Sequence, residues 1–200
     1  MFTRHESFSQ YVRNYPVIST IILLQILLFI INFIPMIPHK FILQYLSGVN
    51  IYIANGEYWR LITPIFVHRD FTHLFFNSFS LLIFGPFLET TLEKKLFSLF
   101  YLGCGLMANI ATYLFLPLTY GHVGASGAIF GLFGIYLALI VLKKIEVAKS
   151  TQIIIPLIAI AFIMTFLEPN VNIIAHIFGL LSGFLFSLVY FFTKKEMKKS

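Results

Sequence analysis

GASGAIFGLFG, at residues 124–134, is the stretch that decides the fold of this chain. Gly127, Gly131 and Gly134 follow one another at intervals of four and three residues, so they lie on one face of an α-helix. In a membrane, small residues on such a face let a second helix approach closely. The run therefore predicts a spanning helix that begins at Ser126 and packs tightly against another apolar helix.

The composition of the whole chain agrees with a membrane protein. Hydrophobic residues make up 58% of the 200 residues and charged residues only 11%, and the mean hydropathy is +0.88. Soluble domains carry about a quarter charged residues, so this chain lacks the polar surface to face water on every side. The net charge of +6 does not indicate nucleic acid as a partner. The basic residues stand in short clusters between apolar segments, where they favour contact with anionic lipid head groups.

Six apolar segments are each long enough, at roughly 17–25 residues, to be spanning candidates. We therefore expect an all-α membrane protein, a bundle of six transmembrane helices, in which residues 17–193 form the membrane domain. Residues 1–16 are expected to be a cytoplasmic N-terminal segment and residues 194–200 a basic cytoplasmic tail. The six segments cover residues 17–36, 71–92, 96–116, 126–142, 151–167 and 172–193.

The basic residues predict how these helices are oriented. Eleven of the fourteen Lys and Arg residues fall in the tails and connections on one side, which the positive-inside rule makes cytoplasmic. Both termini are then cytoplasmic, as an even number of spans requires. Residues 37–70 form one long external connection, and its aromatic residues predict that it lies in the outer interface. The short chain and compact loops suit a bacterial plasma membrane.

Four polar side chains stand inside the apolar segments, namely His73, Asn77, Ser126 and His176. Each lies within about two turns of the outer end of its helix, so all four should sit about 5–10 Å below the outer surface. Strongly polar side chains inside a bilayer are costly and indicate function, and a serine beside an imidazole is the minimum for base-activated nucleophilic attack. Taken singly, Ser126 could belong to a packing motif, His176 could be a core histidine, and the other two could join helices. Their common depth favours one shared site.

The spacing of neighbouring residues supports that site. His73 and Asn77 are four residues apart and share a helix face, and His176 shares a face with Gly179 and Gly183. The glycines of the two helices would let their backbones meet, which would carry Ser126 up to His176. We expect a serine–histidine dyad whose histidine is oriented by packing, because no acidic residue is placed to complete a triad. The acids considered are Glu57, Asp70, Glu89 and Glu168.

In this order the motifs resemble those of the rhomboid family, over roughly residues 50–193. Any one of them is a weak signal, whereas the ordered set in a six-helix context is very specific. The matching stretches are Trp59-Arg60, His68-x4-His73-x3-Asn77, Gly85-x3-Glu89, Gly124-Ala125-Ser126-Gly127 and Ala175-His176-x2-Gly179-x3-Gly183.

The resemblance implies an intramembrane serine endopeptidase that cuts transmembrane protein substrates near the extracytoplasmic face, without a cofactor. It implies Ser126 as the nucleophile and His176 as the general base, with an oxyanion hole formed by His73, Asn77 and the Ser126 amide. His68 matches a family histidine to which we assign a structural role. Phe130 departs from the family, which often has tyrosine there, but its ring can still pack against His176.

Three other functions are distinguished by features of the sequence. A catalytically inactive rhomboid-like protein, acting in binding or quality control, would be indicated by loss of the serine or the histidine, and both are present. A channel or transporter should continue the polar path to the inner leaflet, yet the last apolar segment beyond Ser182 is apolar except for Ser187. A metalloprotease would carry a His-Glu-x-x-His motif, which the sequence lacks, so we expect no metal. Expected partners are transmembrane substrates and membrane lipid.

Overall fold

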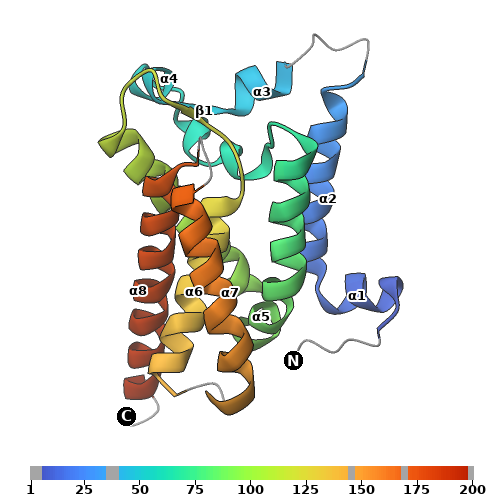
Figure 1. Cartoon of the computed structure of the whole chain (residues 1–200), viewed down its shortest axis with the longest axis vertical. Coiled ribbons are helices and arrows are strands. Elements are labelled where there is room, and N and C mark those ends of the chain that lie inside the picture. Colours follow the sequence, from blue (N-terminus) through green and yellow to red (C-terminus); the bar gives the residue numbers. More distant parts are fainter. Residues whose placement is uncertain (1–5, 35–40, 144–146, 168–170, 198–200) are drawn as a thin grey trace.

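The computed structural model describes residues 6–34, 41–143, 147–167 and 171–197 of the chain. Helices dominate it, and two very short strands pair antiparallel, with Gly48 opposite His122 (Figure 1). The helices are α1 (Phe8–Asn14), α2 (Pro16–Ile31), α3 (Phe41–Leu46), α4 (Asn50–Ala54), α5 (Phe71–Phe115), α6 (Ser126–Val141), α7 (Val147–Leu167) and α8 (Ile173–Met197), with 3-10 helices η1 (Tyr58–Leu61) and η2 (Thr63–Phe66) and strands β1 (Gly48–Val49) and β2 (Gly121–His122).

The structure confirms an all-α chain of apolar helices that follow the expected segments closely. The segments expected over 71–92 and 96–116 are two helical parts of α5, which meet at a break at Glu93. Glu93 has a φ of 65°, in the left-handed region, and this one residue replaces the longer connection that the sequence suggested. Part of the first expected segment, residues 35–36, lies outside the described residues.

The apolar helices differ in length. By length and composition α5 and residues 173–194 of α8 can each cross a bilayer, and α1 with α2 form a third span if their 109° bend is counted within it. Ser126–Val141 and Ile154–Leu167 are shorter apolar helices. The 16 residues of α6 rise about 24 Å, somewhat less than the ~30 Å hydrocarbon core of a typical bilayer.

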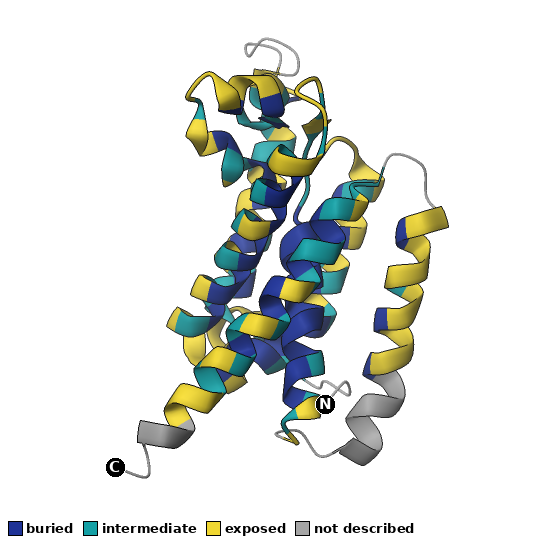
Figure 2. Cartoon of the chain, turned by 90° about the vertical axis from the view of Figure 1, so that its left-hand side faces the viewer, coloured by how far each residue is buried: buried dark blue, intermediate teal, exposed yellow. Residues whose placement is uncertain are grey.

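Helix α6 is the centre of the bundle. Its residues from Gly127 to Tyr136 are all buried, as expected for a helix that is apolar all round (Figure 2). On one side Gly127 and Gly131 face Ala108 and Cys104, which belong to the part of α5 that follows Glu93. Cys104 is fully buried there and acts as a packing residue. On the other side α6 meets α8.

The contact between α6 and α8 is made by backbone. A methyl group added at Gly179 would overlap the carbonyl of Gly127, one at Gly183 would overlap the carbonyl of Gly131, and one at Gly134 would overlap the carbonyl of Leu180. We refer to Gly127, Gly131, Gly134, Gly179 and Gly183 as the glycine seam. The glycine seam fixes the position of α8 against α6, because no side chain between the two helices could rotate to accommodate a shift.

One buried carboxylate of α5 caps helix α2. The two oxygens of Glu89 accept hydrogen bonds from the amides of Val17 and Ile18, each at 3.0 Å, and Glu89 is 2% exposed. These amides lie in the first turn of α2, where Tyr15 provides no side-chain cap. Glu89 therefore caps a helix more than 70 residues away in the sequence, and its charge suits the positive end of the helix dipole. Gly85, one turn earlier, leaves room for the Ile18 side chain.

Removing this cap should loosen α2. We expect Glu89→Ala to lower the free energy of unfolding by about 1–3 kcal/mol, since it leaves the part-buried amide of Val17 and the buried amide of Ile18 without acceptors. Glu89→Gln should lower it by less, because one amide oxygen remains. The measurement is reversible unfolding in mixed detergent micelles. Glu93→Gln is the matched control, because Glu93 is an exposed glutamate one turn further on. Equal stability of Glu89→Ala and wild type would contradict the assigned role.

Candidate active site

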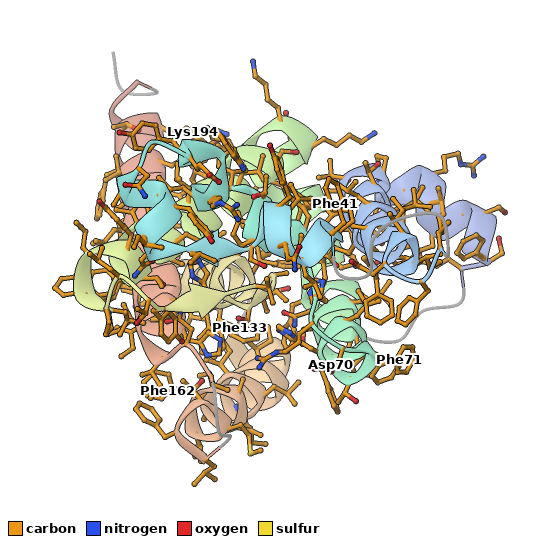
Figure 3. The ribbon with its side chains drawn as sticks, turned by 90° about the horizontal axis from the view of Figure 1, so that it is seen from above. Phe41, Asp70, Phe71, Phe133, Phe162 and Lys194 are labelled. Atoms are coloured by element: carbon orange, nitrogen blue, oxygen red, sulfur yellow. The ribbon has the colours of Figure 1, made fainter. Side chains whose placement is uncertain are left out.

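The site is built where α5, α6 and α8 begin, at the upper end of the bundle in Figure 1. Seen from above, Asp70 marks the start of α5, Phe133 lies toward the middle, and Phe71 and Phe162 lie at the periphery (Figure 3).

Ser126 is the first residue of α6, as the sequence predicted. The residue two positions before it is Gly124, whose φ of 120° is a backbone conformation that residues with a side chain rarely adopt. The Gly124 amide donates a hydrogen bond of 2.8 Å to the Pro64 carbonyl, which ties the turn to η2. Ser126 is half-buried, and its amide is one of those that the first turn of a helix leaves without an intrahelical partner.

His73 reaches this turn from α5. A side chain at Gly124 would meet the ring atoms Nε2 and Cε1 of His73 at 2.5 and 2.6 Å, so the imidazole packs directly on the Gly124 backbone. Asp70 caps α5 by accepting the His73 amide at 2.8 Å. Asn77, which is 6% exposed, donates from Nδ2 to the His73 carbonyl at 2.8 Å. An amide group carries two N–H donors, so one donor of Asn77 remains beyond this bond.

His176 is held on two sides in α8. The Phe130 ring stacks on it with 4.0 Å between ring centroids and 13° between planes, so the expected packing of Phe130 against His176 is confirmed. Its Nδ1 atom lies 2.8 Å from Oγ1 of Thr165 in α7, a hydrogen bond that the sequence analysis did not foresee. The signal for it was present: Thr165 is the only polar side chain between residues 154 and 167.

The glycine seam brings the flanks of Ser126 and His176 into contact. A methyl group at Gly127 would lie 3.6 Å from the carbonyl oxygen and 3.7 Å from Cβ of Ala175, so the residue after Ser126 lies next to the residue before His176. Within the described residues no hydrogen bond joins the side chains of Ser126 and His176.

His68 is a buried neighbour of this cluster. Its ring meets that of His73 edge to face, with 5.0 Å between centroids, and only 1% of it is exposed. Burial, with a smaller contribution from His73, lowers the pKa of His68 to about 3, so the ring is neutral at pH 7. A neutral ring packed behind His73 is consistent with the structural role expected of it.

Trp59 and Arg60 lie apart from the four polar residues and organise the connection before α5. The Arg60 guanidinium is 4% exposed and donates to the carbonyls of Gln44 and Ser47 at 2.9 and 2.7 Å and to Glu57. Trp59 donates from Nε1 to the Tyr45 carbonyl at 3.3 Å. The pair therefore fastens α3 to η1 and supports the site only through the loop.

Three of the four acids considered for a triad have other roles. Glu57 pairs with Arg60, Asp70 caps α5, and Glu89 caps α2. Glu168 lies outside the described residues. The described part of the chain thus gives His176 a hydroxyl partner and an aromatic partner.

The fold and this arrangement define an all-α integral membrane protein with polar side chains converging near one end of a glycine-packed bundle. A family model described as the rhomboid domain matches residues 55–192. The chain is 46% identical over 192 residues to "Putative rhomboid protease YdcA" of Bacillus subtilis (strain 168), covering 94% of this chain and 96% of that protein. It is 40% identical to "Rhomboid protease GluP" of the same organism over 137 residues, which are 68% of this chain and 26% of GluP.

A plant relative, "RHOMBOID-like protein 6, mitochondrial" of Arabidopsis thaliana, is 37% identical over 139 residues, 68% of this chain and 45% of that protein. The chain belongs to the rhomboid family.

Proposed function

We propose that this protein is an intramembrane serine endopeptidase that cleaves transmembrane proteins near the extracytoplasmic face of the membrane. The observation that carries the proposal is the seam contact between Gly127 and Ala175, which holds the residues next to Ser126 and His176 together at the start of a buried helix. A serine beside a histidine can act as an activated nucleophile. Membership of the rhomboid family supports the same activity.

In the proposed reaction, His176 takes the proton from the Ser126 hydroxyl while the oxygen attacks the carbonyl carbon of the substrate. The negative charge that develops on the carbonyl oxygen is stabilised by the Ser126 amide, Asn77 and His73. His176 then gives its proton to the leaving amine, and a water molecule releases the acyl group from Ser126 by the reverse sequence. The free donor of Asn77 and the packing of His73 beside Gly124 support these assignments.

The membrane arrangement is part of the proposal. Six spans, with α5 counted as two, place both termini in the cytoplasm and the starts of α6 and α8 toward the outer face, and a bacterial plasma membrane suits this arrangement. The alternative is a catalytically inactive rhomboid-like protein that binds membrane proteins. The presence of both Ser126 and His176 favours the enzyme.

The substrate class follows from the cost of exposing a peptide bond. A helix in lipid has its backbone groups paired, and each one left unpaired costs several kcal/mol. We therefore expect single-pass substrates with Gly or Pro near their outer end, where the helix unwinds readily, and a small residue such as Ala before the cut.

The test is to map the cut in a single-pass reporter reconstituted in liposomes with the purified protein, with and without EDTA. We expect cleavage near the extracytoplasmic boundary, unaffected by chelation, that weakens when a Gly-Pro pair is moved toward the helix centre. Ser126→Ala provides the background. Cutting at the cytoplasmic end, or activity lost with EDTA and restored by zinc, would refute the proposed site.

A further inference from the structure

Helix α7 touches the bundle along one narrow face. Between residues 154 and 167 only Ile154, Ile158 and Thr165 are buried, with Ala161 half-buried, and these positions recur every three to four residues on one side of the helix. In Figure 2, α7 is the helix whose lower turns are grey, and it is mostly yellow apart from a narrow dark face toward the bundle. Apolar side chains alone would be enough to bury this narrow face of α7.

Thr165 is nevertheless a polar residue on that face, and it is 2% exposed. Its hydroxyl lies 3.0 Å from the Ala161 carbonyl and 2.8 Å from Nδ1 of His176. A hydroxyl in a membrane helix often bonds the carbonyl four residues earlier. The bond to His176 is the additional feature, since it crosses to another helix and ends on a ring nitrogen.

The number of hydrogens decides the direction of each bond. A carbonyl oxygen can only accept, so both contacts are hydrogen bonds at the same time only when Thr165 donates its single hydroxyl hydrogen to Ala161. In that arrangement the Thr165 oxygen accepts from His176, and the hydrogen of the neutral imidazole is on Nδ1. Nε2, on the opposite side of the ring, therefore carries the lone pair.

We propose that Thr165 is a positioning residue that holds His176 in the Nδ1–H tautomer and so leaves Nε2 free to accept the proton of Ser126. This inference rests on the proposed function. Thr165 fulfils the orienting part of the task that a carboxylate has in a triad, where the third group fixes the tautomer and the angle of the imidazole. Phe130 restrains the face of the same ring.

The hydroxyl that meets His176 comes from a different helix, α7, at the edge of the bundle. Because Thr165 belongs to α7, the base is correctly set only while α7 is docked against the bundle. Outward movement of α7 would break the bond between Thr165 and His176 and free the ring to change its tautomer. The position of this peripheral helix is thereby coupled to the readiness of the site.

The test compares Thr165→Val, which keeps the shape but removes the hydroxyl, with Thr165→Ser, which restores it. We expect Thr165→Val to lower kcat roughly tenfold to a hundredfold, part of what general-base catalysis contributes, with KM little changed. Thr165→Ser should remain within about threefold of wild type. Ser182→Ala is the matched control, because Ser182 is a buried hydroxyl that bonds the Gly179 carbonyl of its own helix, and it should leave kcat unchanged.

The tautomer of His176 distinguishes a positioning role of Thr165 from a purely structural one, because loss of a structural contact would not change it. Nitrogen-15 NMR of protein labelled at histidine, with His176 assigned by its loss in His176→Ala, should show the Nδ1–H form in wild type and Thr165→Ser. In Thr165→Val the Nε2–H form should appear. Unchanged kcat in Thr165→Val, or lowered kcat with the tautomer unaltered, would overturn the inference.

The two proposals fail separately. If wild type cut no reporter at all, or if Ser126→Ala cut as well as wild type, the proposed function would fall, while the NMR experiment would still decide the tautomer. If Thr165→Val did not fold, the Nε2–H form in wild-type protein would by itself refute the assignment. The Nδ1–H form in wild type and in an active Thr165→Ser protein would support it.

Discussion

Ser126→Ala and His176→Ala should each remove nearly all cleavage of a transmembrane reporter, and the double variant should be scarcely less active than either single variant. Residues that act as one unit give such non-additive losses, because the first substitution already abolishes the step in which both take part. The measurement is the initial rate of product formation in liposomes, with a detection range of at least about four orders of magnitude, since dyad losses are of that size.

Two controls make this result interpretable. Each variant should unfold at the same denaturant concentration as wild type, which separates loss of chemistry from loss of fold. A mechanism-based serine inhibitor should label Ser126 in wild type and fail to label it in His176→Ala, because the unactivated hydroxyl is a weak nucleophile. Substantial cleavage by Ser126→Ala would show that another residue performs the attack.

The second large effect is expected in the glycine seam. Gly183→Ala should lower the free energy of unfolding by about 3 kcal/mol or more, since over-packing typically costs 1–3 kcal/mol and here the added methyl meets the Gly131 backbone, which cannot rotate away. Helix propensity alone predicts the opposite sign, a gain of about 1 kcal/mol for Gly→Ala in a helix interior. Reversible unfolding in mixed micelles decides between them.

Gly121→Ala is the matched control for the seam. A methyl group there would lie 3.7 Å from the Val49 side chain, an ordinary contact, so the same substitution should be nearly neutral. Cleavage should fall with Gly183→Ala, because α8 can no longer bring His176 to the start of α6. A stabilised Gly183→Ala protein would mean that the two helices are held by something other than backbone contact.

The sequence predicted the helices and the packing of α6 well, for a physical reason. Apolar length and the spacing of Gly127, Gly131, Gly179 and Gly183 depend on helix geometry alone, which is the same in every protein. The start of α6 at Ser126 followed from the apolar segment that begins there, whereas the packing of Phe130 on His176 was expected from the rhomboid resemblance. The roles of Ser126, His176, His73 and Asn77 stay predictions until activity is measured.

The residues that support the site were harder to find. Glu89 caps α2 across 71 and 72 residues of sequence, and Arg60 holds carbonyls 13 and 16 residues away. Periodicity indicates which face of a helix is buried, but it does not specify which distant backbone group a side chain will meet. Thr165 lies 11 residues from His176, on another helix, so its bond depends on how closely α7 docks.

The burial of Cys104 against Gly131 has a practical consequence. It is the sole thiol of the chain, and it is fully enclosed between α5 and α6, out of reach of water-borne maleimides. A cysteine introduced on the exposed side of α7, for instance at Phe162, would therefore be the one reactive thiol in an otherwise unaltered protein. A spin label or fluorophore placed there can report the mobility of α7 without any background mutation.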